Sequence, residues 1–252
     1  MKAKDIEMNI FEEIKKLVKE NPAYIIIETV LYGDVGEVFY SYKDKLLNVF
    51  IKLSDFFIIE GEISEDAREY LEYMTPHAEI ISSNEKWYEF ILSNGGEGNI
   101  NKRIVFDNSK LNKEILKDIL RNKDNNCKIE RINESLVKRL LRDRWSRDLV
   151  ANFNSCEGFV KNGIGFVVID GLKVVSGASS VSRFKDRIEI EIDTNPSYRR
   201  NGYATLAGAA LILYCLENGL SPHWDAMNKV SCKLATKLGF VPYKEYKTLL
   251  LE

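Results

Sequence analysis

A strand that runs through a short turn into a long helix constrains this sequence more than any other feature. From Arg187 to Thr194, isoleucine alternates with charged or polar residues, which predicts a strand with one apolar and one polar face. Asn195-Pro196 follows, and Asn201 to Asn218 is a helical stretch rich in small residues that ends at Gly219. Strand and helix patterns alternate throughout this half of the chain, which indicates an α/β sheet layered with helices.

The turn between this strand and helix has the composition of an anion-binding site. It reads R-x-x-G-x-A from Arg199 to Ala204. Backbone N–H groups at the start of a helix point toward one spot, where the helix dipole favours a negative group. Gly202 lets the backbone approach a ligand closely, and the arginines can add charge-assisted bonds. The pattern alone is weak, but between a strand and a helix it predicts a pyrophosphate site.

A second motif follows in the order that a cofactor fold would require. It runs from Asn228 to Phe240, opening with an asparagine and closing with L-G-F. Together the two motifs resemble the acyl-CoA-binding motifs of the GNAT superfamily. More narrowly, IEIEIDTNPSYRRNGYA and PHWDAMNKVSCKLATKLGF are similar to the GNAT subfamily that includes the zwittermicin A self-resistance acetyltransferase.

The resemblance implies a fold, a reaction and a cofactor. The expected fold class is α/β (α+β): a GNAT fold, with a mixed, mostly antiparallel sheet flanked by helices and a smaller N-terminal α/β domain. The implied reaction moves an acetyl group from acetyl-CoA to a primary amine of a small molecule. The residues implied to bind the cofactor are Ile192, Asp193, Thr194, Arg199, Arg200, Asn201, Gly202, Tyr203, Ala204, Asn228 and Ser231. Asn228 also suits a helix N-cap, which is the alternative to a cofactor contact.

Three carboxylates on one face of the first strand are candidates for a general base. An amine must be neutral to attack a thioester, so a nearby base is useful. Glu189, Glu191 and Asp193 alternate with the isoleucines, and their mutual repulsion should raise the pKa of at least one of them. We expect Glu191 to be the catalytic base, followed by Glu189. The alternative is that these side chains bind substrate or face water.

One position departs from the pattern of the family. Many GNAT enzymes carry a tyrosine four residues after the position of Ser231, as the acid for the leaving thiolate, and this chain has Ala235 there. Tyr203 or Ser231 could serve instead, or the thiolate could leave without help. The departure also keeps open a second function, a GNAT-fold module that binds acyl-CoA without catalysis.

Other polar or aromatic residues have a purely structural interpretation as well as a functional one. Residues 176–180 (S-G-A-S-S) contain serines but have no histidine nearby, so we interpret them as a closely packed strand and reject a serine hydrolase. Trp145, Trp224 and Asp225 could line a substrate pocket, although Trp224 is at least as suited to the core.

The chain length fits two domains, and the polar run at residues 121–126 is the best linker candidate. We therefore expect an N-terminal α/β domain over residues 1–125 and a catalytic domain over 126–252, the former implied by the resemblance to be a degenerate GNAT-like domain. Within the N-terminal part, Tyr24 to Leu31 fits either a helix or a buried strand. The patterns further predict a helix at Glu65 to Met74 and a loop at Asn94 to Asn101.

Composition excludes several classes of function. Hydrophobic residues make up 45%, charged residues 29%, and the net charge is −2, which does not favour nucleic acid or an anionic membrane as a partner. Four cysteines without a C-x-x-C pair and two histidines do not predict a metal site. No apolar segment suits a signal peptide or a membrane span, so we expect a cytoplasmic protein. The sequence leaves open whether two copies form a homodimer.

Overall fold

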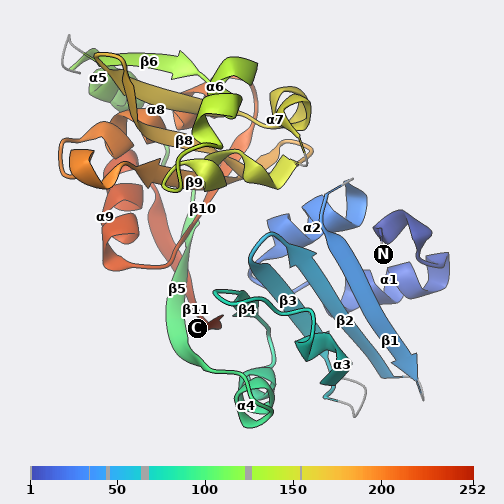
Figure 1. Ribbon diagram of the computed structural model, residues 1–252. Helices are drawn as coiled ribbons and strands as arrows, with labels where there is room; N and C mark the ends of the chain where they lie inside the picture. Colours follow the sequence, from blue (N-terminus) through green and yellow to red (C-terminus); the bar gives the residue numbers. More distant parts are fainter. Residues whose placement is uncertain (1, 34, 44–45, 64–67, 123–126, 154) are drawn as a thin grey trace. The chain divides into compact units, whose positions relative to one another are not determined.

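The computed structural model describes all residues except 1, 34, 44–45, 64–67, 123–126 and 154 (Figure 1). The chain divides into two compact units. The first contains Met1–Arg103 and Glu245–Glu252, and the second contains Ile104–Lys244. This division falls earlier in the chain than the boundary expected near residue 125, and it returns the last residues to the first unit. The expected linker extends over residues 123–126, which lie outside the described residues.

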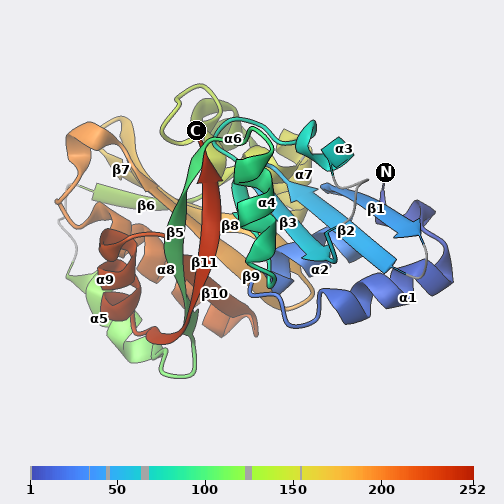
Figure 2. The same ribbon diagram turned by 90° about the horizontal axis from the view of Figure 1, so that it is seen from below.

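The first unit combines short helices with strands in the order β1-β2-β3-β4-β11, followed by the first part of β5. The pairs are antiparallel except for β3 and β4, which are parallel. Figure 2 shows β1, β2 and β3 side by side. Its elements are η1 (Ala3–Asp5), α1 (Met8–Leu17), α2 (Tyr24–Tyr32), β1 (Glu37–Lys43), β2 (Leu46–Leu53), β3 (Phe56–Gly61), α3 (Arg68–Leu71), β4 (Glu79–Ile81), α4 (Lys86–Ser93) and parts of β5 (Gly98–Asp107) and β11 (Val241–Leu251).

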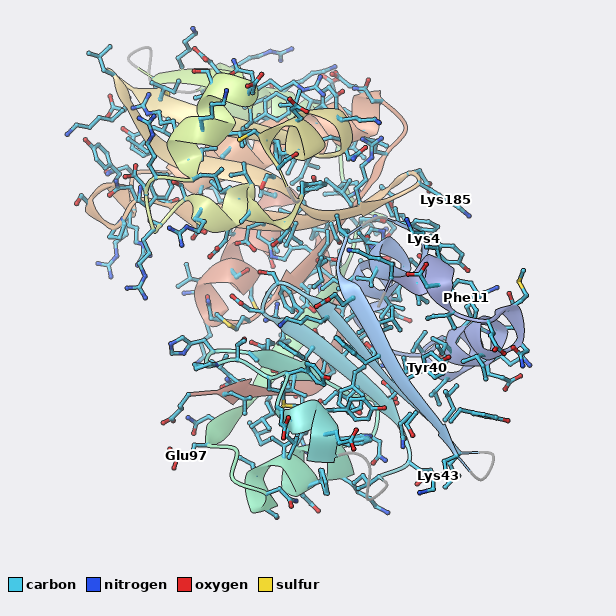
Figure 3. All side chains as sticks on the ribbon, turned by 45° about the vertical axis from the view of Figure 1, so that its right-hand side comes forward. Lys4, Phe11, Tyr40, Lys43, Glu97 and Lys185 are labelled. Atoms are coloured by element: carbon cyan, nitrogen blue, oxygen red, sulfur yellow. The ribbon has the colours of Figure 1, made fainter. Side chains whose placement is uncertain are left out.

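Helices cover both faces of this sheet. The amphipathic helix α1 buries Ile10 and Ile14 against one face, and α2 packs there as well. Phe11 of α1, labelled in Figure 3, meets the ring of Tyr32 edge-on at 5.6 Å. The opposite face carries an aromatic cluster in which Trp87 of α4 packs against Phe50 of β2. Residues 24–31, which fit either a helix or a strand by pattern, lie in helix α2. The pattern did not separate the two possibilities because a buried helix is apolar on nearly all sides.

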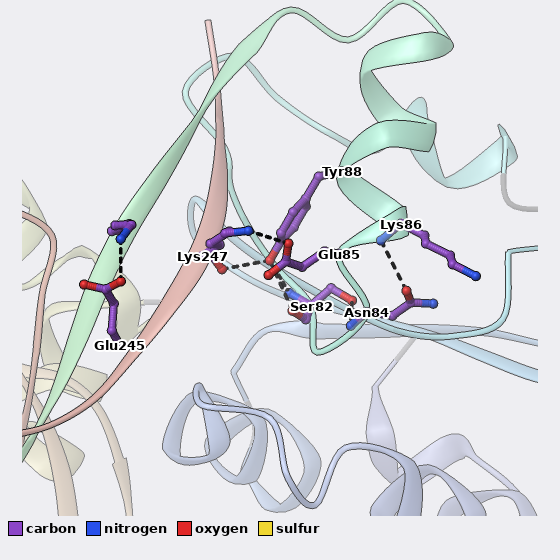
Figure 4. Close-up of polar contacts among 8 residues, drawn as sticks. Ser82, Asn84, Glu85, Lys86, Tyr88, Glu245 and Lys247 are labelled. Carbon is purple, nitrogen blue, oxygen red and sulfur yellow. Dashed lines mark hydrogen bonds and ion pairs between the residues drawn. The ribbon is translucent and has the colours of Figure 1, made fainter.

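A buried tyrosine fastens β11 to the first unit (Figure 4). The Tyr88 hydroxyl accepts a hydrogen bond from the backbone N–H of Ser82 at 3.0 Å and lies 2.9 Å from the carbonyl oxygen of Lys247. Burial raises the pKa of Tyr88 to about 12, so the hydroxyl keeps its hydrogen. The Lys247 ammonium also pairs with Glu85 at 2.7 Å. These contacts explain why the end of the chain belongs to the first unit.

Two predictions of local structure need correction. Residues 94–101 were expected to form a loop, but β5 begins at Gly98, where a Cβ would lie 2.4 Å from the carbonyl oxygen of Leu250. The glycine signals a close approach of two backbones and not a loop. The helix expected at residues 65–74 covers only Arg68–Leu71 of the described residues. Residues 64–67 are outside the described part, so the start of that helix is not described.

The second unit has a mixed, mostly antiparallel sheet in the order β5-β10-β9-β8-β7-β6, as the sequence predicted. The exception is the pair β9 and β10, which is parallel. Its elements are α5 (Lys113–Arg121), β6 (Cys127–Arg131), α6 (Glu134–Leu140), η3 (Arg147–Leu149), η4 (Ala151–Phe153), α7 (Cys156–Asn162), β7 (Gly165–Asp170), β8 (Lys173–Phe184), β9 (Arg187–Thr194), η5 (Pro196–Tyr198), α8 (Tyr203–Glu217), β10 (Ser221–Ala226) and α9 (Lys229–Leu238). Lys185, labelled in Figure 3, lies in the β8–β9 turn with a left-handed φ of 54°.

The two faces of this sheet have different neighbours (Figure 1). The isoleucine side chains of β9 pack with α8. On the other face, Leu149 of η3 fills the space that Gly177 of β8 leaves without a side chain. The Ser179 hydroxyl donates to the carbonyl oxygen of Leu149. The small residues of β8 therefore pack closely, as the sequence predicted, and the structure shows that η3 is the element they pack against.

The two units share a strand arrangement, apart from β6, which lies beyond β7 in the second unit and has no counterpart among the described strands of the first. Each has an antiparallel meander (β1-β2-β3 or β7-β8-β9), then a parallel neighbour (β4 or β10), then a further strand from elsewhere in the chain (β11 or β5). The connection between the parallel strands holds α8, of 15 residues, in the second unit and α3, of 4 described residues, in the first. No helix among the described residues is long and apolar enough to cross a membrane.

We predict that Tyr88→Phe lowers the free energy of unfolding by about 1–3 kcal/mol, because the buried N–H of Ser82 loses its acceptor. Urea denaturation measures the change. Tyr243→Phe, at a β11 tyrosine that is 76% exposed, is the matched control and should be neutral. Equal stability of the two variants would show that the Tyr88 hydroxyl does not fasten β11.

Candidate acyl-CoA site

The turn before α8 has a backbone suited to an anion. Asn195 caps η5 by accepting from the N–H of Ser197, and Arg200 and Gly202 then adopt left-handed φ angles of 67° and 81°. The first helical hydrogen bond runs from the N–H of Leu206 to the carbonyl oxygen of Gly202 at 3.2 Å. The N–H groups of the residues before Leu206 lie in the first turn of the helix, where no preceding helical turn supplies carbonyl oxygens to accept their hydrogen bonds. A left-handed residue followed by a helical one turns successive N–H groups toward a common point.

The side chains of this turn leave its surface open. Arg199, Arg200, Asn201 and Gly202 are exposed, and Tyr203 and Ala204 are partly buried. Arg199 makes a long contact of 3.4 Å from Nε to the carbonyl oxygen of Thr194. The Tyr203 hydroxyl, considered above as an acid for the thiolate, instead donates to Asp170 at 2.8 Å.

The edge of β9 that leads away from this turn is open to a ligand. Parallel pairing with β10 covers Arg187, Ile188 and Glu189, whose partners are Ser221, Pro222 and His223. Residues 224–226 of β10 pair with β5 instead. Among the described strands, β9 therefore has a partner only on its β8 side from Ile190 to Thr194. Backbone groups along that edge, including Ile192 to Thr194, can pair with an extended ligand.

The second motif forms α9 as predicted. The side chain of Asn228 accepts from the N–H groups of Val230 and Ser231, both at 3.0 Å, so it caps the helix. The Ser231 hydroxyl accepts from Nε1 of Trp224, which is core and 4% exposed. Ala235 is fully buried and faces the core, so the position where many relatives carry tyrosine has no access to a ligand. Gly239, with φ of 105°, ends the helix, and Phe240 returns to the core.

The three carboxylates of β9 lie on the face opposite α8, as the alternation predicted. The pKa of Asp193 is raised to about 7, mainly by burial and also by the nearby charge of Asp148, while Arg199 opposes the shift. A raised pKa was expected here, but its main causes are burial and a residue of η3, and not the neighbouring glutamates. Glu191 accepts at 3.2 Å from the N–H of Ile192.

Position along the strand separates the three carboxylates. Asp193 adjoins Thr194 at the end next to the turn, whereas Glu189 lies where β9 and β10 part. Five residues of strand cover roughly 17 Å. Asp193, whose pKa is raised, therefore lies at the turn end of the strand, and Glu189 lies at the end that pairs with β10.

Sequence reasoning did not select two residues that the tertiary structure brings to this face. Asp148 lies in η3, a short 3₁₀ helix (Arg147–Leu149). His223 lies beside Glu189 in the parallel pair. A histidine in a strand next to a buried apolar residue gave no signal of its own; only the register between β9 and β10 reveals its neighbour. No group of three or more metal-ligand side chains occurs within the described residues.

Comparison with known proteins agrees with this geometry. The family model of the GNAT acetyltransferases matches residues 15–249. The chain belongs to this family. Membership supports acetyl-CoA as the cofactor of this GNAT acetyltransferase and acetyl transfer as its reaction, with no substrate specified. The exposed turn and the open strand edge fit the pyrophosphate and the arm of that cofactor.

Three proteins are similar to this GNAT chain in sequence or in structure. A GCN5-related N-acetyltransferase-like protein from Streptococcus suis 89/1591 is similar with a TM-score of 0.87 and 28% identity, over 97% of this chain and 99% of that one. An uncharacterised N-acetyltransferase, YdfB of Bacillus subtilis (strain 168), is 40% identical over 96 residues, and the match spans only 37% of either chain. A tandem GNAT protein from the clavulanic acid biosynthesis pathway shares the fold, with a TM-score of 0.61 and 11% identity over 99% of this chain and 96% of that one.

We predict that Gly202→Ala weakens acetyl-CoA binding about tenfold, the equivalent of about 1.4 kcal/mol. The reason is that a Cβ disfavours the left-handed backbone that aims the N–H groups of the turn. Isothermal titration calorimetry gives the dissociation constant. Gly219→Ala is the matched control, because Gly219 also has a left-handed φ, of 69°, and open space around its Cα, at the other end of α8. Equal losses of affinity in both variants would contradict a ligand role for the turn.

A second prediction concerns the pH dependence of stability. Because the pKa of Asp193 is raised from 3.8 to about 7, the folded state holds a proton that the unfolded state releases between these values. The contribution of Asp193 to stability therefore falls as pH rises through this window. Asp193→Asn should be more stable than the wild type at pH 8, and this advantage should disappear toward pH 4. Urea denaturation across pH tests this, with Glu217→Gln, at an exposed position of α8, as control. A difference that does not vary with pH would contradict the raised pKa.

Proposed function

We propose that this chain is an N-acetyltransferase that transfers the acetyl group of acetyl-CoA to a primary amine of a small molecule. One observation carries the proposal. The turn before α8 follows β9, and the edge of β9 has no strand partner on its β10 side, among the described residues, from Ile190 to Thr194. When bound, acetyl-CoA supplies an acetyl group activated as a thioester. Backbone N–H groups from Arg200 to Ala204 hold its pyrophosphate, and the edge from Ile192 to Thr194 pairs with its arm.

The carboxylate face of β9 receives the amine. Glu189 and Glu191 lie on that face near the far end of the open edge, and one of them accepts the proton of the incoming ammonium. Glu191 is the candidate chosen from sequence, while the register favours Glu189, which lies beside the last pair of β9 and β10. A face with several carboxylates attracts a cationic acceptor, which supports an amine substrate.

The remaining residues of the two motifs have supporting roles in this proposal. Asn228 caps α9 and thereby fixes the N–H groups and the Ser231 hydroxyl beside the cofactor. Ser231 is the remaining candidate for protonation of the thiolate, since Tyr203 donates to Asp170 and Ala235 is buried. The stretches around residues 188–204 and 222–240 support a place in the subfamily that includes the zwittermicin A self-resistance acetyltransferase.

The first unit, in this proposal, is a degenerate GNAT-like domain without a cofactor site. Its strand topology matches that of the second unit, and the fold resembles that of a tandem GNAT protein. The sequence between its parallel strands, residues 62–78, has no counterpart of the R-x-x-G-x-A turn that precedes α8. The expected stoichiometry is therefore one acetyl-CoA per chain.

We predict that Glu189→Gln lowers kcat by about 10²–10⁴, the usual contribution of a general base, while the dissociation constant of acetyl-CoA stays unchanged. Thiol release from acetyl-CoA with a panel of small primary amines measures turnover. Glu191→Gln, made in parallel, decides between the two carboxylates, and the exposed Glu217→Gln is the control. If neither glutamine variant affects turnover, the carboxylate face does not supply the base.

A second candidate function, acyl-CoA binding without catalysis, is favoured by one observation. The position at which many relatives carry an acid is Ala235, which the core covers completely. Binding of acetyl-CoA without turnover of any amine in the same panel would support this function over the transferase.

A further inference from the structure

We infer that Asp170 is a positioning residue for acetyl-CoA binding: its carboxylate holds the side chain of Tyr203 and thereby keeps the turn before α8 in the shape that receives the pyrophosphate. The inference rests on the proposed function, because it concerns the cofactor site of that function. Neither sequence motif includes Asp170, which lies 33 residues before Tyr203 in the chain.

A direct hydrogen bond joins the two side chains. The Tyr203 hydroxyl donates to a carboxylate oxygen of Asp170 at 2.8 Å. A bond from a hydroxyl to a carboxylate is about twice as strong as one between neutral groups. Both residues are partly buried, which limits the competition from water. The bond therefore ties the first residue of α8 to the last residue of β7.

The sheet fixes the position of the acceptor. Asp170 pairs with Cys127 of β6 on one side and with Lys173 of β8 on the other. Val168 of β7 packs on the α8 face of the sheet, whereas Ile169 packs on the opposite face. Alternation along the strand then directs Asp170 toward α8, in agreement with the hydrogen bond. A carboxylate on a strand with two paired neighbours is a rigid point of attachment for the turn.

Tyr203 carries this attachment into the turn. Its ring packs with the apolar cluster between α8 and the sheet, and its centroid lies 6.4 Å from that of Tyr198 at the other end of the turn. The side chain of Asn201 donates to the carbonyl oxygen of Tyr198 at 3.2 Å. The segment between the two tyrosines is thus a closed loop. Fixing the Tyr203 hydroxyl restricts the first helical residues, so the N–H groups of the turn keep a common direction.

This restriction matters for affinity because a turn that is already ordered loses little conformational entropy when it binds a ligand. Removal of either partner should weaken acetyl-CoA binding about tenfold. A carboxylate that acted on the phosphates only through its charge would repel them, and its removal would strengthen binding. The sign of the change therefore separates positioning from simple repulsion.

Isothermal titration calorimetry of the full chain with acetyl-CoA tests the inference. Tyr203→Phe and Asp170→Ala should each raise Kd about tenfold, and the double variant should raise it no further, because both changes remove one interaction. Asp170→Asn, whose side-chain oxygen can still accept, should recover most of the affinity. Tyr214→Phe is the matched control, because this partly buried tyrosine of α8 contacts Phe166 and Arg131 through its ring. Its Kd should equal that of the wild type.

A second ligand distinguishes positioning from a general loss of structure. S-acetylpantetheine carries the arm and the thioester without the pyrophosphate, so its Kd, measured by NMR titration, should be the same in all these variants. Tighter acetyl-CoA binding by Asp170→Ala would overturn the inference. Additive losses in the double variant, or an equal loss of affinity for S-acetylpantetheine, would overturn it as well.

The Gly202→Ala variant separates failure of the inference from failure of the proposed site. Wild-type affinity for acetyl-CoA in Gly202→Ala would place the cofactor elsewhere and overturn both. Weakened binding in Gly202→Ala together with wild-type affinity in Tyr203→Phe would overturn the positioning role alone. None of these measurements requires turnover, so an enzyme that acetylates no amine in the panel would still give a decision on Asp170.

Discussion

The separation of β9 from β10 after three paired residues is the constraint on which the candidate site depends. Parallel pairing joins residues 187–189 to 221–223, and β10 then pairs with β5 over residues 224–226. Because β9 continues with β8 as its only described partner, its backbone edge from Ile190 to Thr194 is available for the proposed pairing with a ligand. The same separation places Glu189 and His223 at one end of that edge and the turn before α8 at the other.

The two faces of β9 pack against different elements. The isoleucines meet α8, so the helix that begins at the turn is held against the strand that leads into it. The opposite face is covered in part by η3, which approaches closely because Gly177 has no side chain and Ser179 donates to Leu149. This approach helps to bury Asp193 and places Asp148 near it, which explains why the pKa of Asp193, at the turn end of β9, is raised to about 7.

The shared topology of the two units gives a physical account of their difference. Both have a meander, a parallel neighbour and a last strand taken from another part of the chain. The connection between the parallel strands distinguishes them. Two residues with left-handed φ, Arg200 and Gly202, precede α8, whereas the described part of the corresponding connection in the first unit contains α3 (Arg68–Leu71). The proposed pyrophosphate site thus belongs to a connection and not to the strands that the two units share.

The sequence by itself determined the elements whose signals are local. The alternation in β9, the glycine in the turn, the asparagine cap of α9 and the glycine that ends it all act within a few residues, so the residue pattern over 187–240 was sufficient to predict these elements. The loop expected at residues 94–101 was wrong because the backbone that Gly98 meets belongs to Leu250, far away in the chain. Only the tertiary structure decided that β11 completes the first unit, that burial acts on Asp193, and that His223 lies beside Glu189. Each of these depends on the register or packing of segments distant in sequence, which no local pattern encodes.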